Sequence, residues 1–120
     1  MPTRVEQEAP AGTVRVANEV IASIAAMAAK EIDGVAGLDD ASARHFGDWI
    51  KRQTAHRGVR VMVDAEKAIH LEVFVTVDAN AVLGDVAERV QANVVESVER
   101  MLNLDVAEVN VFVSSIAFDH

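Results

Sequence analysis

Four histidines are the residues of this chain with the widest chemical repertoire, because an imidazole binds metal ions and exchanges a proton near neutral pH. They lie at positions 45, 56, 70 and 120, separated by 11, 14 and 50 residues. Zinc ligands usually come as closely spaced pairs, and the chain has no cysteine to supply a thiolate. The sequence therefore predicts no metal site and no cofactor.

Paired acids and hydroxyls are the other candidates for chemistry. Acid–base catalysis needs two groups that converge on one substrate. The adjacent pair Asp39–Asp40 lies in a polar segment, and Glu96 and Glu99 are three residues apart on a predicted helix surface, so neither pair implies convergence. Ser114–Ser115 have no flanking nucleophile motif. We therefore predict a protein that is not an enzyme and has no small-molecule substrate.

The last third of the chain predicts the elements that position these residues. Aliphatic residues at every second position from Ile69 to Val77 are typical of a half-buried strand. Apolar residues then recur at helical spacing over about 82–103, which predicts an amphipathic helix with Asn80 as its cap and its end at 103–105. Alternation returns over about 106–116, as in a strand. This pattern is typical of a scaffold.

The first two-thirds begin with a polar segment, 1–11, for which we expect disorder. A single domain follows over 12–118, with a polar insert at about 39–57. An alanine-rich helix is expected, capped by Asn18 and ended by the glycines that follow. In chain order the expected elements are a short strand at 13–16, a helix at 17–32, an extended segment at 34–38 and a hairpin of 59–63 with 68–78.

This order of elements predicts a two-layer α+β domain, with both helices on one face of a mixed sheet of about four strands. Alternation places mostly valines toward the helices, at 59, 61, 63, 71, 73, 75, 109, 111 and 113. The opposite face then holds Met62, Phe74 and Phe112, which are too apolar for a face fully in water. Two explanations remain open: an amphipathic turn at 46–50, with Trp49, folds over this face, or another subunit covers it.

His70 shares the same predicted face with Asp64 and Glu72. A neighbouring carboxylate would make His70 titrate near neutral pH, because carboxylates stabilise the imidazolium. A histidine that is merely exposed to solvent is the other interpretation.

The charge of the chain is −8, which argues against nucleic-acid binding, since affinity for phosphates comes from lysine and arginine. One segment, 44–60, is nevertheless basic, with a single acid. It contains Arg44, Lys51, Arg52, Arg57 and Arg60. This segment is either a solvated loop or a docking patch for an acidic partner or an anionic lipid surface.

We expect a cytoplasmic protein. The first residues show no basic region followed by an apolar run, as a signal peptide would, and no stretch reaches the roughly 18 apolar residues of a membrane span. Any association with a membrane would then be peripheral or through a partner.

Several short motifs, in order, resemble the alkaline shock protein (Asp/Gls-type) envelope stress family. They cover about residues 12–116, and each alone is weak. The motifs are Gly12-Thr13-Val14-Arg15-Val16, Asp33-Gly34-Val35-Ala36-Gly37-Leu38, Gly58-Val59-Arg60-Val61, Leu71-Glu72-Val73-Phe74-Val75, Val86-Ala87-Glu88-Arg89-Val90-Gln91 and Val109-Asn110-Val111-Phe112-Val113.

The resemblance implies a small cytoplasmic protein without catalytic residues, linked to envelope stress. It also implies self-association into a homo-oligomer and a membrane-anchored protein partner. Combined with the apolar sheet face, it makes Met62, Phe74, Phe112 and Trp49 the candidate interface residues. The basic insert departs from the family pattern.

Overall fold

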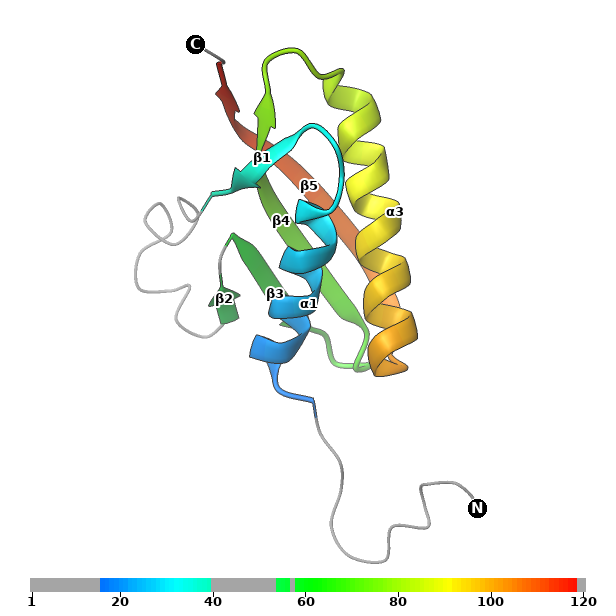
Figure 1. Cartoon of the computed structure of the whole chain (residues 1–120). Coiled ribbons are helices and arrows are strands. Elements are labelled where there is room, and N and C mark those ends of the chain that lie inside the picture. Colours follow the sequence, from blue (N-terminus) through cyan, green and yellow to red (C-terminus); the bar gives the residue numbers. More distant parts are fainter. Residues whose placement is uncertain (1–15, 40–53, 57, 119–120) are drawn as a thin grey trace, which may run out of the picture.

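The computed structural model describes residues 16–39, 54–56 and 58–118. Two helices lie on one face of a five-stranded mixed sheet (Figure 1). In chain order the elements are α1 (Asn18–Lys30), β1 (Val35–Leu38), β2 (Thr54–His56), β3 (Val59–Val63), β4 (Ile69–Asp78), α3 (Leu83–Leu102) and β5 (Val106–Ala117). The predicted α+β class is confirmed.

The additional strand, relative to the four or so predicted, is β2, which pairs antiparallel with β3. It lies inside the segment expected to be a polar insert, where the sequence shows no alternation long enough to reveal a strand of three residues. The short strand expected at 13–16 lies outside the described residues, apart from Val16. So does the amphipathic turn expected at 46–50.

The central strand of the sheet is β4, which is also its longest inner strand. On one side it pairs antiparallel with β3 along its first half and with β1 along its second half. On the other side it pairs parallel with β5 along its whole length. The hairpin of β3 and β4 is confirmed, and its turn is closed by Asp64, whose Oδ1 accepts the N–H groups of Glu66 and Ala68 at 2.9 Å each.

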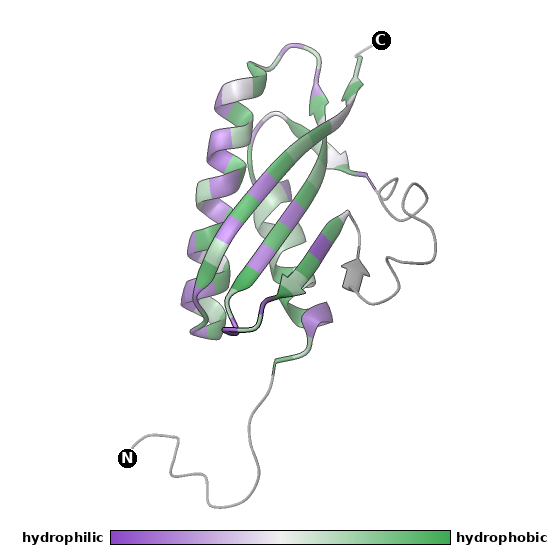
Figure 2. Cartoon of the chain, turned by 180° about the vertical axis from the view of Figure 1, so that it is seen from behind, coloured by the Kyte–Doolittle hydropathy of each residue, from purple (hydrophilic) through white to green (hydrophobic). Residues whose placement is uncertain are grey.

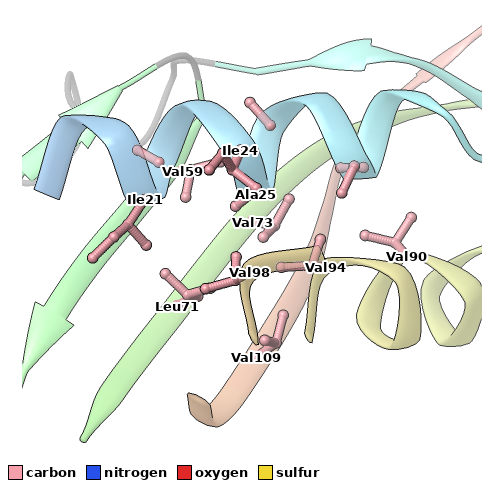
Figure 3. Packing of buried hydrophobic residues seen from close by; sticks show 14 of the residues in the cluster. Ile21, Ile24, Ala25, Val59, Leu71, Val73, Val90, Val94, Val98 and Val109 are labelled. Atoms are coloured by element: carbon pink, nitrogen blue, oxygen red, sulfur yellow. The ribbon is translucent and has the colours of Figure 1, made fainter. Parts of the chain in front are cut away.

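The core lies between the sheet and the two helices (Figure 3). Ala22, Ala25 and Ala29 of α1 are fully buried. Because these side chains are small, the two helices can approach each other closely. The valines of α3 pack beside them and over the sheet, and the fully buried ones include Val90, Val94 and Val98. Such dense packing of small aliphatic groups is the main stabilising term of the domain.

Both predicted helix caps are wrong. Asn18 and Asn80 do not cap, since the N-cap positions are Ala17 and Val82 and neither helix has a side-chain cap. Tertiary packing of the apolar stripes therefore decides where the helices begin, as is common for helices stabilised mainly by burial. The predicted end of the second helix is confirmed: Asn103 has the left-handed φ of 55° and its N–H donates to the Glu99 carbonyl.

Six of the nine residues predicted to face the helices are buried, and Val111 is half-buried. Two are exposed: Val63 is 48% exposed and Val113 is 36% exposed. Val63 is the last residue of β3, and Val113 lies in the second half of β5. Alternation assigns a residue to a face, but it does not say how far along a strand the helices extend.

Candidate functional site

The face of the sheet turned away from the helices, here called the outer face, carries the residues singled out for function. Figure 2 looks at this face and shows hydrophobic and hydrophilic residues alternating along β4 and β5. Strand register places these residues in rows across β3, β4 and β5. The rows are Arg60–Glu72–Asn110, Met62–His70–Glu108, Phe74–Phe112 and Thr76–Ser115.

The first row holds a buried ion pair. Arg60 of β3 and Glu72 of β4 are opposite in the register, and Nη2 of Arg60 lies 3.1 Å from Oε1 of Glu72. Arg60 is only 5% exposed, although it lies on the outer face. The outer face is therefore closed to solvent at Arg60 within a single copy of the chain.

The second row holds His70 between two carboxylates from different strands. Its Nε2 lies 2.8 Å from Oδ2 of Asp64, and its Nδ1 lies 2.9 Å from Oε2 of Glu108. Asp64 directly follows β3 and Glu108 lies on β5, so the ring of His70 joins β4 to segments on both sides of it. The Asp64 neighbour was predicted from the alternation and is confirmed, whereas Glu72, the other predicted neighbour, is bonded to Arg60.

These contacts shift the titration of both partners. The hydrogen bond to Asp64, and then that to Glu108, raises the pKa of His70 above its ordinary value of 6.5. The hydrogen bond from His70, and then that from the Ala68 N–H, lowers the pKa of Asp64 below its ordinary 3.8. Within this group of His70, Asp64 and Glu108, here called the triad, folding therefore favours the imidazolium form of His70 and the carboxylate form of Asp64.

The stability of the protein should consequently fall as His70 loses its proton. A histidine whose pKa is raised by folding stabilises the native state below its unfolded pKa, and this contribution is lost as the pH rises through the raised value. The lowered pKa of Asp64 acts oppositely, and its contribution is lost as the pH falls through that value. Urea unfolding of the wild type from pH 6 to 9 should show the first loss.

A His70→Gln variant serves as the comparison, because its amide does not titrate while the other three histidines remain. Its stability should change less than that of the wild type over the same pH range. Equal slopes for the two proteins would contradict a role for the triad.

The triad does not form a metal site. Its two carboxylates bind opposite nitrogens of the ring, so the three side chains do not converge on one point where a cation would sit. Within residues 16–39, 54–56 and 58–118, no group of three potential ligands has a geometry suited to a metal ion.

Phe74 of β4 and Phe112 of β5 form the aromatic row of the outer face. Their rings are stacked, with centroids 5.0 Å apart and planes inclined by 16°. Phe74 is half-buried, whereas Phe112 is 43% exposed. Met62, the third predicted interface residue of this face, is half-buried opposite His70. Exposure of the face thus rises from β3 toward β5.

The serines near the end of the chain bond within the outer face. Ser114 Oγ donates to Oδ2 of Asp39 at 2.8 Å, and Thr76 Oγ1 and Ser115 Oγ lie 2.6 Å apart. The Asp39 contact spans β4, because β1 and β5 lie on opposite sides of that strand. These serines hold strands together.

The basic patch predicted at 44–60 is described at one residue only. Arg60 lies within the sheet and binds Glu72, so its guanidinium is not at an open basic surface. Trp49, Arg44, Lys51, Arg52 and Arg57 lie outside the described residues.

An open groove of about 720 Å³ lies between α3 and β5, and no pattern in the sequence predicted it. Its walls include four glutamates and the apolar residues Ala92 and Val95. The glutamates are Glu88, Glu96, Glu99 and Glu108. Alternation had placed Glu108 on the outer face, but the approach of α3 to this strand carries no local signal in the sequence.

No helix in the described part of the chain has both the length and the apolar character needed to span a membrane. No solved structure matches the chain.

Known proteins similar to this chain span nearly its whole length. It is 28% identical to the uncharacterised protein YloU of Bacillus subtilis (strain 168), over 93% of this chain and 94% of that protein. It is 32% identical to the uncharacterised protein YqhY of the same organism, over 90% of this chain and 79% of that one. The family model for alkaline shock protein 23, described by a cell envelope-related function, matches residues 6–118. The chain therefore belongs to the alkaline shock protein 23 family and shares its relation to the cell envelope.

Proposed function

We propose that this protein is a non-enzymatic cytoplasmic scaffold of the cell-envelope stress response, which associates with itself and with a membrane-anchored protein. The observation that carries the proposal is the partly exposed aromatic row on the outer face, in a family related to the cell envelope. A scaffold acts through surfaces, and stacked aromatics beside open solvent are typical of protein interfaces.

The side chains of the outer face support this interpretation over a catalytic one. His70 is held between two carboxylates, Arg60 is bonded to Glu72, and Ser114 is bonded to Asp39. These polar groups are thus engaged by neighbouring side chains of the sheet and its adjoining turns. The apolar surface that remains open is at Phe112.

Self-association should weaken when this surface is charged. Replacing Phe112 by aspartate would put a carboxylate in the centre of the candidate interface, where its desolvation opposes association. We expect sedimentation velocity to show a smaller species or a weaker concentration dependence for Phe112→Asp than for the wild type.

The matched control is Val20→Asp, because Val20 is 44% exposed on α1 and Phe112 is 43% exposed on the outer face. Circular dichroism establishes that both variants fold. Equal weakening by the two substitutions would mean that added negative charge is responsible, and would count against the outer face.

The partner is tested by purifying the tagged protein from host membranes in mild detergent, with and without a high-salt wash. Recovery of an integral membrane protein that is lost with Phe112→Asp but kept with Val20→Asp would support the proposal. Recovery of anionic lipid alone, lost in high salt, would instead indicate peripheral binding, because salt screens surface attraction.

A further inference from the structure

The strand β5 is a long edge of the sheet. It has 12 residues, Val106–Ala117, and among the described strands it pairs with β4 alone. Figure 2 shows it running beside β4 on the side away from β3. An edge strand presents a row of backbone N–H and C=O groups that another strand can bond.

The helix α3 covers only the first half of this edge. Oε2 of Glu99 accepts the Val106 N–H at 3.1 Å, and Nε2 of Gln91 donates to the Val109 carbonyl at 2.7 Å. These two side chains occupy backbone groups at the start of β5. The edge beyond Val109 is the part left for another strand.

The second half of β5, here residues 110–117, and Phe118 after it carry no charge. They include no acid, no base and no proline, and four of their apolar side chains are exposed. Phe112 is 43%, Val113 36%, Ile116 42% and Phe118 68% exposed. Natural edge strands are usually protected by charge, proline, short length or a bulge. This half of β5 has no charge and no proline, and its register against β4 shifts once, between Val113 and Ser115.

We infer that the second half of β5 is a pairing edge for a second copy of this chain, which joins antiparallel to give one sheet continuous through both copies. The inference rests on the proposed self-association and assigns it to this edge. Two identical edges satisfy each other around a two-fold axis, which is the commonest symmetry of protein dimers.

The charges along β5 favour the antiparallel arrangement and a second copy as occupant. In a pair centred near Val113, the uncharged run of each copy lies against the uncharged run of the other. The two Glu108 residues would be about ten residues apart along the strands, roughly 33 Å. A parallel pair would set Glu108 against Glu108, and like charges opposite each other are unfavourable. An uncharged edge also offers nothing to select a charged peptide.

Val113→Lys tests the edge, because it places two lysines beside the two-fold axis of the pair. Lysine on an edge strand opposes strand pairing. The expected result is self-association at least about tenfold weaker than in the wild type, measured by sedimentation equilibrium. Val20→Lys is the control, since Val20 is similarly exposed but lies on α1. It should associate as the wild type does.

Cross-linking gives a second measurement that does not depend on the lysine variant folding. The chain has no cysteine, so Val113→Cys introduces a single thiol. Directly opposed residues of antiparallel strands have Cβ atoms about 4.5–5.5 Å apart, close enough for a disulfide after small adjustments. Mild oxidation should convert Val113→Cys to a covalent dimer faster than Glu66→Cys, which places its thiol in the exposed β3–β4 turn.

The outcomes separate this inference from the proposed function. Loss of association with Val113→Lys, together with rapid cross-linking of Val113→Cys, supports the edge. Association unchanged by Val113→Lys, or cross-linking no faster than at position 66, overturns the edge and leaves the scaffold proposal standing. A wild-type protein that stays monomeric overturns both.

Discussion

Replacing Gly58 by alanine should lower the free energy of unfolding by at least about 2 kcal/mol, since a left-handed conformation alone costs a residue with a Cβ about 1–2 kcal/mol. Gly58 has φ of +84° and lies where β3 begins and β1 ends beside β4. A Cβ there would lie 2.9 Å from the Asp39 carbonyl oxygen and 2.9 Å from Cβ of Leu38. Backbone atoms cannot rotate away as a flexible side chain would, so the strands themselves must separate.

The comparison is Gly84→Ala, in the first turn of α3, where a Cβ would meet no atom within 4 Å. Alanine there should stabilise the protein by about 0.5–1 kcal/mol, because it lowers the conformational entropy of the unfolded chain. Urea unfolding followed by circular dichroism measures both variants. If Gly58→Ala were as stable as the wild type, the backbone at this junction would have to differ from the one described.

The fold class was predictable because its signals are local. Period-two alternation in β4 and helical periodicity in α3 appear within ten to twenty consecutive residues, and both elements end within a residue or two of their predicted bounds. The helix caps were not predictable. Asn18 and Asn80 had the right chemistry for caps, but the N-cap positions are Ala17 and Val82, and neither helix has a side-chain cap.

The site was predictable only in part, because its contacts depend on register between distant segments. Alternation assigned His70, Glu72, Phe74 and Phe112 to one face, which the structure confirms. It did not place Glu108 beside His70, since these residues are 38 apart in the sequence and meet only through the parallel pairing of β4 with β5. Nor does the sequence show which side of the outer face is closed.

The closed side of the outer face is the one that contains Arg60, and it supports placing association at β5. A guanidinium that is 5% exposed has already lost most of its water within one copy of the chain. The open apolar residues lie instead on β5, at Phe112 and beyond. The proposed scaffold surface and the proposed pairing edge therefore share one strand.

Replacing Glu72 by leucine should lower the free energy of unfolding by about 3 kcal/mol, because it removes a carboxylate that lies against the buried charge of Arg60. The side chains of Arg60 and Glu72 are 6% and 19% exposed, and their atoms lie 3.1 Å apart. Glu96→Leu on α3 is the control. That carboxylate also binds an arginine at 3.1 Å, Arg100, but both side chains are more than 60% exposed. Its loss should cost at most about 0.5 kcal/mol.

The double variant Arg60→Met with Glu72→Leu distinguishes the loss of an ion pair from the loss of packing. Removing both charges together leaves neither member of this pair without the other, and apolar pairs of similar volume often replace buried ion pairs at little cost. The double variant should therefore unfold at higher urea concentration than Glu72→Leu alone, although it carries one more substitution. A double variant less stable than Glu72→Leu would show that Arg60 stabilises the outer face through contacts other than Glu72, and that the closed side of the sheet depends on the arginine itself.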